Sequence, residues 1–298
     1  MSIDPKIGLK AGTVVLSDHQ KEWEIEACKT ISILKNILGS IIKDIQHVGS
    51  TSIPSIKAKP IIDIAIEIDD LDNILKYKEK LEINGFYYRD KCQLKNQRLF
   101  ACGDHYNGLG NTQTHYIHVF QANSQEWINT INFRDYLRQN ISVAKQYEAL
   151  KIDLAQKFAN CPKRDEYING KNDFIKSVCR DALFYSFLGK IVNVKIDRPM
   201  GSLHPKFKDI IYKVNYGFIP NTTSGDDEEI DVYLLGVDHP VSDFQARVIA
   251  IIHRLNDVED KLVAAPEGIT FSKSEIESAV NFQEKYFKTE IKVLNSSI

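Results

Sequence analysis

The sequence has no long hydrophobic run. Its longest uninterrupted apolar segment covers residues 248–252, whereas a membrane-spanning helix needs about 20 apolar residues. The first residues also lack the basic stretch and apolar segment that mark a signal peptide. We therefore expect a cytoplasmic protein with no membrane partner.

The sequence also lacks an excess of charge of either sign. The 38 Lys and Arg nearly balance the 40 Asp and Glu, for a formal net charge of −2, so the composition indicates no nucleic-acid partner. The five cysteines are an odd number without a C-x-x-C pair. They indicate reduced thiols rather than a disulfide framework or a thiolate metal site.

The sequence is long enough and hydrophobic enough to form two folded domains. It contains 298 residues, of which 43% are hydrophobic, and a typical domain takes about 150. The pattern changes near residues 181–189, from helix-rich to short alternating segments broken by Gly, Pro and Asn. We expect an α/β (α+β) domain at 1–185 and a small β-barrel domain at 186–298.

Apolar periodicity predicts the main elements of both halves. Residues 60–68 alternate strictly, so the isoleucines should line one face of a strand while Asp63, Ala65 and Glu67 line the other. The other expected elements of the first half are helices at 19–38, 71–84 and within 125–180, and strands near 86–101 and 115–121. In the second half we expect strands at 191–196, 211–219, 231–235 and 247–253, and a final helix that a capping box opens at Ser272.

A Gly-Ser turn and a strand-borne aspartate mark the first half. Gly49 and Ser50 come shortly before Asp63. A Gly-Ser turn lets the backbone approach a phosphate, and a carboxylate on the next strand can hold Mg²⁺ against it. This order is typical of the polymerase-β-like nucleotidyltransferase superfamily, although Gly-Ser turns and strand aspartates are also common structural features. Arg134, which shares a helix face with Arg138, can serve a phosphate or a surface salt bridge equally well.

A longer set of motifs resembles the GrpB family, which is assigned to the nucleotidyltransferase fold. The resemblance covers residues 10–182 and rests on segments 49–54, 58–64, 115–119 and 133–138 together with Tyr167, Lys171 and Phe174. It implies a nucleotide partner, with Gly49, Ser50, Lys59 and Arg134 at its phosphates and Asp63 on the metal.

One departure affects this first site. Position 65 is alanine, where an active nucleotidyltransferase carries its second carboxylate. Glu67 lies about 13 Å along the strand from Asp63 and cannot replace it. Nucleotide binding without transfer therefore stays open. His115 and His118, three apart on a strand, should face opposite ways, one packed and one facing a pocket.

Two acidic clusters mark the second half. The first is the run 226–231, whose carboxylates would repel one another in a compact loop unless cations sat there. The second is Asp257, Glu259 and Asp260, followed by Lys261. The alternative for an isolated acidic run is a solvated turn. Two clusters and a lysine suit Mg²⁺ ions that grip a diphosphate and activate a water.

Residues 189–293 resemble the soluble family I inorganic pyrophosphatases. The resemblance rests on the segment Asn-Tyr-Gly-Phe-Ile-Pro at 215–220 and the acidic loop at 226–231. It implies an OB-like barrel in which Asp231, Asp226, Tyr216 and Lys261 are catalytic. It also implies metal ligands at Asp226, Glu228, Asp231, Asp257, Glu259 and Asp260, and phosphate contacts at Lys206, Tyr286 and Lys288.

The second resemblance has departures as well. Lys213 replaces a proline, the domain is short, and the family's active-site arginine finds no counterpart. Lys195 or Asp197 stands where a metal-binding glutamate is expected.

The C-terminal domain is therefore expected to hydrolyse inorganic pyrophosphate with Mg²⁺ as cofactor, next to a GrpB-like domain that binds a nucleotide, with transfer of a nucleotidyl group left open. The alternatives are a regulatory protein that binds nucleotide or pyrophosphate without turnover, and a barrel enzyme with an inactive first domain as scaffold. A homo-oligomer stays open.

Overall fold

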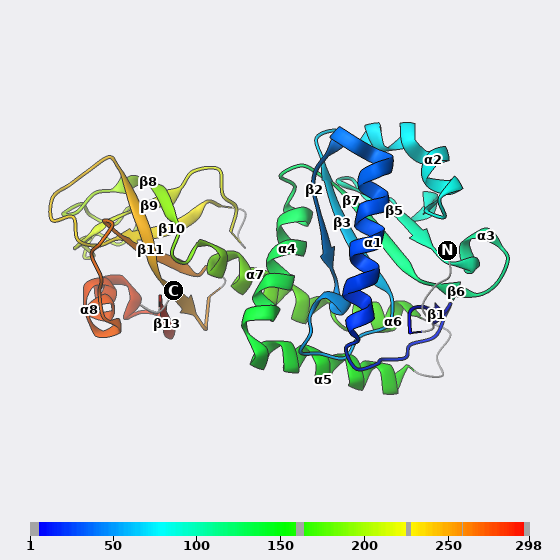
Figure 1. Ribbon diagram of the computed structural model, residues 1–298. Helices are drawn as coiled ribbons and strands as arrows, with labels where there is room; N and C mark the ends of the chain where they lie inside the picture. Colours follow the sequence, from blue (N-terminus) through cyan, green and yellow to red (C-terminus); the bar gives the residue numbers. More distant parts are fainter. Residues whose placement is uncertain (1–5, 159–163, 225–227, 258, 295–298) are drawn as a thin grey trace. The chain divides into compact units, whose positions relative to one another are not determined.

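The computed structural model describes residues 6–158, 164–224, 228–257 and 259–294 (Figure 1). Contacts within the chain divide it into two compact units, Met1–Ala182 and Leu183–Ile298. The boundary expected at residue 185 falls inside helix α7, Asn172–Phe187, which contains this division.

A five-stranded mixed sheet forms the centre of the first unit. Its strand order is β2-β3-β7-β5-β4, and only the β3–β7 pair is parallel. The strands are β2 (Ile42–Val48), β3 (Ile62–Ile68), β4 (Tyr87–Tyr88), β5 (Gln97–Cys102) and β7 (His115–Gln121). The short strands β1 (Leu9–Lys10) and β6 (Thr112–Gln113) pair separately.

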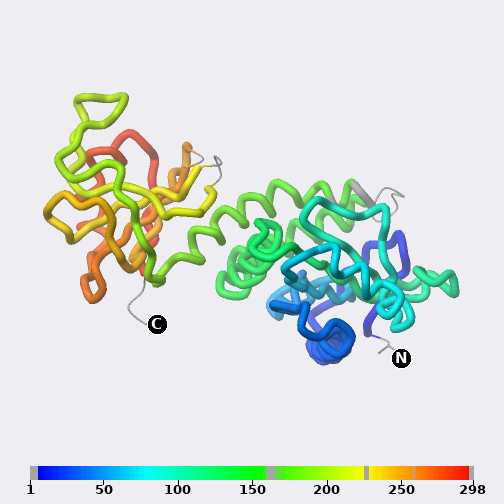
Figure 2. Tube along the Cα trace, turned by 90° about the horizontal axis from the view of Figure 1, so that it is seen from above, coloured from blue at the N-terminus to red at the C-terminus, as the bar shows by residue number. Residues whose placement is uncertain are grey.

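Helices cover both faces of this sheet. Helix α1 (Lys21–Leu38) packs on the face that carries the β3 isoleucines, and Figure 2 shows it on the side of the sheet away from α4 and α5. On the other face Ala65 packs against Trp127 of α4, so the predicted alternation of β3 is confirmed. The remaining helices are η3 (Leu71–Tyr77), α2 (Lys78–Ile83), α3 (Asp104–Asn107), α4 (Gln125–Gln139), α5 (Ile141–Lys157) and α6 (Arg164–Asn169), with short 3-10 turns at Gly39–Ile41, Ser50–Ser52 and Asp90–Cys92.

The second unit is a closed five-stranded barrel. The pairings run β8–β9–β10–β12–β11 and return to β8, and β13 adds to β11 outside the ring. Closure leaves the ring strands without a free edge. The elements are β8 (Ile191–Arg198), β9 (Asn215–Ile219), β10 (Ile230–Leu234), β11 (Asp243–Arg254), β12 (Lys261–Ala265), α8 (Lys273–Glu284) and β13 (Thr289–Val293).

These folds confirm the expected α/β unit followed by a small OB-like barrel. The capping box at Ser272 is also confirmed, since its side chain accepts from Glu275 N–H and the Glu275 carboxylate accepts in return from Ser272. Strands β2, β12 and β13 were not predicted from the sequence. Residues 86–101 were expected to be one strand, but they form β4 and β5 with a turn between them.

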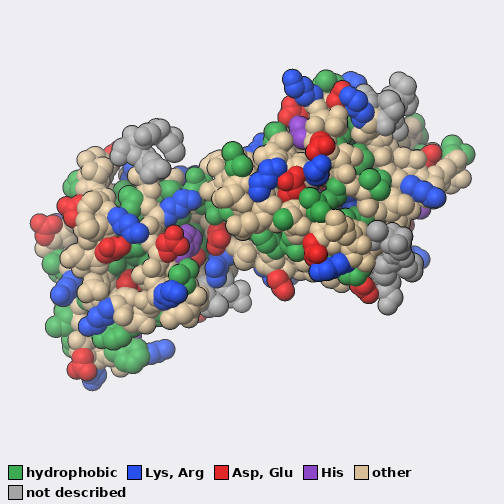
Figure 3. Space-filling view, turned by 90° about the horizontal axis from the view of Figure 1, so that it is seen from below, with side chains coloured by type: hydrophobic (Ala, Val, Ile, Leu, Met, Phe, Trp, Pro, Cys, Tyr) green, Lys and Arg blue, Asp and Glu red, His purple; other side chains and the backbone are tan. Residues whose placement is uncertain are grey.

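The structure also bears on membrane-spanning helices, surface charge and the state of the cysteines. No described helix is long and apolar enough to cross a membrane. On the face drawn in Figure 3, basic and acidic side chains are interspersed rather than gathered by sign. The four cysteines within the described ranges, Cys28, Cys92, Cys102 and Cys179, are free thiols.

Candidate functional site

The barrel holds a cavity of about 680 Å³ with a strongly charged wall. Six carboxylates and four basic side chains line it. The acids are Asp197, Glu228, Glu229, Asp231, Asp257 and Glu259, and the bases are Arg198, Lys206, Arg254 and Lys261. Carboxylate oxygens are the ligands that Mg²⁺ prefers in proteins, so this donor set fits the ion.

Lys261 lies at the centre of the charges in this barrel cavity. It opens β12 beside Asp231 of β10, because the two strands are parallel and Val232 pairs with Leu262. Its side chain is only 2% exposed, and its ammonium group donates to Asp231 and, at 2.6 Å, to Glu259. A buried ammonium group needs such partners to offset its desolvation. Lys261 thereby fixes one carboxylate from each predicted acidic cluster.

Tyr216 of β9 approaches the same aspartate. Tyr216 is buried beside Asp231, and burial together with that negative charge raises the pKa of Tyr216 well above its usual value. The tyrosine is therefore neutral at ordinary pH. The neighbouring Gly217 is required because a Cβ there would overlap the Lys195 carbonyl of β8.

Arg254 is a cavity residue that the sequence analysis missed. Its guanidinium donates to Glu284 at 2.9 and 2.6 Å and to Asp257 at 3.3 Å, and it lies 3.7 Å from the centre of the Phe287 ring. The available signal was its place directly after the apolar strand core at 248–252, where a strand end can turn a charged side chain into a site.

The predicted barrel residues separate into two groups. Lys206, Glu228 and Asp257 line the cavity with those described above, and so does Asp197, one of the two alternatives for a metal-binding glutamate. Asp226 lies outside the described residues.

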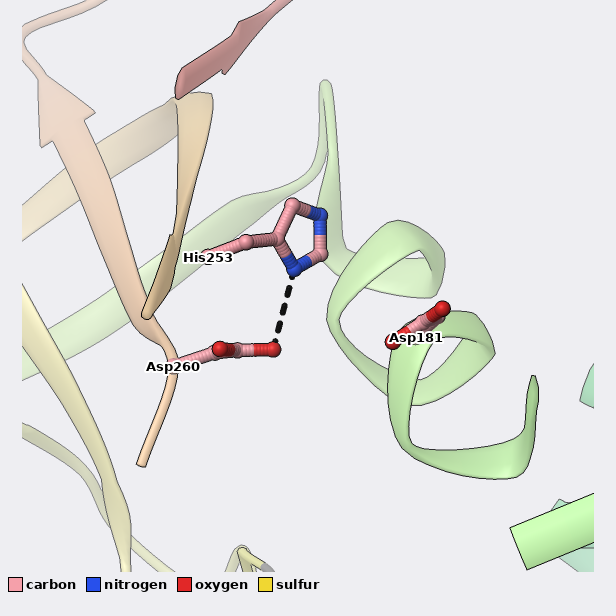
Figure 4. Close-up of side chains that lie close together, drawn as sticks. All are labelled: Asp181, His253 and Asp260. Carbon is pink, nitrogen blue, oxygen red and sulfur yellow. Dashed lines mark hydrogen bonds and ion pairs between the residues drawn. The ribbon is translucent and has the colours of Figure 1, made fainter. Parts of the chain in front are cut away.

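Three other predicted residues do not line this cavity. Asp260 is buried, and its carboxylate accepts from Arg254 N–H and from His253 Nδ1, both at 3.0 Å (Figure 4). Tyr286 is 60% exposed, while Lys288 uses its backbone N–H to bond Asn256. The metal role of Asp260 and the phosphate contacts of Tyr286 and Lys288 thus stay predictions, and none of the three residues lines the cavity for which they were expected.

In the first unit, the turn after β2 lies against Asp63. Val48 and Asp63 are register partners, and Gly49 adopts φ +68° and ψ −174°. A Cβ at residue 49 would lie 2.8 Å from the Asp63 Cβ. Glycine is thus required at this position both for the backbone conformation and for the close approach of the aspartate.

The two histidines of β7 face opposite sides of the sheet, as predicted. His118 Nε2 lies 3.3 Å from Asp63 Oδ1. His115 is buried near Thr30 and Thr114, and burial lowers the pKa of His115 to about 4. His115 is therefore a neutral packed residue at ordinary pH.

Helix α4 holds the backbone on both sides of the Gly-Ser turn. Arg134 donates to the His47 carbonyl at 3.0 Å, and Arg138 donates to the Ser52 carbonyl at 2.8 Å. Arg134 is also buried and bonded to Asp135. The predicted phosphate contact of Arg134 is not supported by this geometry, because its guanidinium supports the turn.

Two cavities adjoin Asp63. Ser50, Lys59 and Asp63 line a small one of about 150 Å³, while Gly49 and Asp63 line another of about 550 Å³. The position of the absent second carboxylate is filled, since Ala65 is fully buried with Val48, Phe120 and Trp127. Glu67 accepts instead from Asn123 N–H. Asp63 is the only acid of β3 on the wall of either cavity.

Comparison with known proteins matches each unit to a different family. The model of the GrpB protein family matches residues 13–181, and the inorganic pyrophosphatase family model matches residues 190–292. A curated relative, glutamate-rich protein GrpB of Alkalihalophilus pseudofirmus, is 37% identical over 176 residues, which are 59% of this chain and 99% of the relative.

Solved structures give the same division. The conserved protein GrpB from Enterococcus faecalis is 30% identical with a TM-score of 0.52, covering 58% of this chain and 99% of its own. An inorganic pyrophosphatase from Ehrlichia chaffeensis is 24% identical with a TM-score of 0.31, covering 36% of this chain and 88% of its own. The match of the second unit to the pyrophosphatase family therefore rests on the family model and not on this superposition. The chain belongs to the GrpB family and carries, fused behind the GrpB unit, a unit that matches the inorganic pyrophosphatase family.

Proposed function

We propose that the second unit hydrolyses inorganic pyrophosphate with Mg²⁺, and that the first unit binds a nucleotide. The observation that carries the first part is the hydrogen bond from Lys261 to Asp231, beside Tyr216, in a cavity rich in carboxylates. The match of residues 190–292 to the inorganic pyrophosphatase family supports the same reaction.

The charges of the barrel cavity divide between metal and substrate. Asp231, Asp257, Glu259 and Glu228 would hold Mg²⁺, with Asp226 as a further predicted ligand. When bound, Mg²⁺ lowers the pKa of a coordinated water and offsets the charge of the diphosphate. Lys206, Lys261 and Arg254 supply positive charge for the phosphate oxygens. Tyr216 and Lys261 orient Asp231, which accepts the proton of the attacking water while the P–O–P bond breaks into two phosphates.

The first unit offers Gly49, Ser50, Lys59 and Asp63 to a nucleotide. Nucleotidyl transfer would release pyrophosphate, and its hydrolysis on the same chain would make transfer effectively irreversible. The filled position at Ala65 favours a second candidate, nucleotide binding without transfer, because one carboxylate is left where transfer uses two. In that case the chain is a pyrophosphatase with a nucleotide-binding unit.

A phosphate-release assay separates these functions. The full chain is given pyrophosphate and, in parallel, a panel of nucleoside triphosphates, each with and without Mg²⁺. Release from pyrophosphate without nucleotide consumption supports the barrel enzyme. Calorimetric binding of pyrophosphate or nucleotide without any phosphate release would instead favour a regulatory protein.

A further inference from the structure

Three lysines line the small cavity beside Asp63. They come from distant parts of the first unit: Lys59 precedes β3, Lys151 lies on α5, and Lys171 lies between α6 and α7. We call this set, with the ring of Tyr167, the lysine pocket. The hydroxyl residues Ser50 and Thr51 line it too, and Asp63 is its one described carboxylate.

Lys151 is a buried lysine. It is 2% exposed, its ammonium group donates to the Lys57 carbonyl at 2.6 Å, and it lies 4.8 Å from the centre of the Tyr147 ring. Tyr147 lies one turn earlier on α5 and is buried. Burial, followed by the charge of Lys171, lowers the pKa of Lys151 to about 7. An anion beside Lys151 would offset both effects.

The other two lysines are held on one aromatic ring. The Nζ atoms of Lys59 and Lys171 lie 4.1 Å and 4.7 Å from the centre of the buried Tyr167 ring. A cation over a ring face is attracted to it. Both ammonium groups also belong to residues that line the lysine pocket, so a multiply charged anion in that pocket would be attracted to both.

The two cavities that Asp63 lines differ in size, so they suit different parts of one ligand. The lysine pocket, about 150 Å³, is smaller than the roughly 300–1,000 Å³ of ordinary ligand sites. The neighbouring cavity is about 550 Å³ and includes His118, Phe120 and Phe133 in its wall. The first has room and charge for a phosphate chain, and the second has room and aromatic surface for an organic group.

We propose that the lysine pocket binds the phosphate chain of a nucleoside triphosphate, and that the organic part of this ligand occupies the larger cavity that Asp63 also lines. This inference rests on the nucleotide binding proposed above and deepens it. It assigns phosphate contacts to Lys151 and Lys171 in addition to Lys59.

Lysine acylation read by mass spectrometry tests this proposal residue by residue in the full chain. The probes are inorganic tripolyphosphate and ATP. Both should protect Lys59 and Lys171. Only ATP should also protect Lys176, an exposed residue that lines the larger cavity. Lys35, exposed on α1, should react equally in all samples.

Calorimetry on Lys171→Met and Lys151→Met adds an affinity readout, with Lys35→Met as the matched control. Each pocket variant should weaken ATP binding about tenfold or more, because a charge-assisted contact is lost, and the control should bind like the wild type. Thermal unfolding of each variant verifies that it is folded.

The outcomes separate the inference from the function on which it rests. If ATP binds but Lys59 and Lys171 react as before, nucleotide binding stands and the lysine pocket is wrong. If tripolyphosphate protects both lysines while ATP does not bind, the phosphate site stands and the nucleotide proposal fails. Protection of the two lysines by ATP without protection of Lys176 would overturn the assignment of the larger cavity.

Discussion

The substitution Gly49→Ala probes the contact on which the first site is built. Gly49 has φ +68° and ψ −174°, a region that is essentially reserved for glycine and costs other residues about 1–3 kcal/mol. The added methyl group would lie 2.8 Å from the Asp63 Cβ, and overpacking of this kind costs about 1–3 kcal/mol more. The first unit should therefore lose roughly 2–6 kcal/mol of unfolding free energy.

A matched control separates strain from overlap. Gly39 also has a positive φ, +59°, but a Cβ there would meet no described atom within 4 Å, its chain neighbours aside. Gly39→Ala should thus cost only the backbone strain of about 1–3 kcal/mol. The difference between the two variants measures how tightly Asp63 packs against the turn.

Tryptophan fluorescence during urea unfolding suits this comparison. The chain has two tryptophans, Trp23 and Trp127, and both are buried in the first unit, so the signal reports that unit. Linear extrapolation then gives each unfolding free energy. Equal losses in Gly49→Ala and Gly39→Ala would refute the packing of Asp63 on residue 49.

Three further perturbations test other parts of the molecule. Arg254→Lys should raise the KM for pyrophosphate about tenfold, because lysine lacks the planar guanidinium group that bonds Glu284 and faces the cavity. An unchanged KM in steady-state kinetics would contradict this role of Arg254. Ser272→Ala should cost about 1 kcal/mol in the second unit, seen as faster hydrogen exchange in α8, while Ser272→Asp keeps the cap and should not change it. The pKa of His115 is about 4 in the folded chain and about 6.5 in the unfolded chain. As the pH falls below about 6.5, His115 is therefore protonated in the unfolded chain before it is protonated in the folded chain. His115 should contribute a loss of about 3 kcal/mol between pH 6.5 and pH 4, and the partly buried His47, whose pKa is also lowered to about 4, adds a loss of the same sign. In His115→Gln the fluorescence-detected loss should be smaller, and an unchanged loss would exclude His115 as one of its sources.

Local patterns predicted much of the fold. The strict alternation of residues 60–68 gave β3 and its two faces correctly, because one side of the strand meets α1 and the other meets α4. The capping box at Ser272 marked the start of α8 for a purely local reason. Strands β12 and β13 were missed because pairing with β10 and β11, rather than their own alternation, fixes them.

The candidate sites depend on contacts that sequence spacing cannot give. Lys261 and Asp231 come together because Lys261 begins β12 and Asp231 is the second residue of the adjacent parallel strand β10. Asp260, by contrast, was grouped with its neighbours, although this residue directly before β12 accepts hydrogen bonds from Arg254 N–H and His253. Lys151 carried no signal at all, since only the packing of α5 brings it to the Gly-Ser turn.

The most direct test of the central proposal compares two aspartate variants in Mg²⁺-dependent phosphate release from pyrophosphate. Asp231→Asn removes the carboxylate that Lys261 bonds beside Tyr216, whereas Asp238→Asn changes an exposed carboxylate on the same unit. We expect Asp231→Asn to lose about a hundredfold or more in kcat and Asp238→Asn to match the wild type. Equal rates for all three proteins, or no release by the wild type, would contradict hydrolysis of pyrophosphate in this cavity.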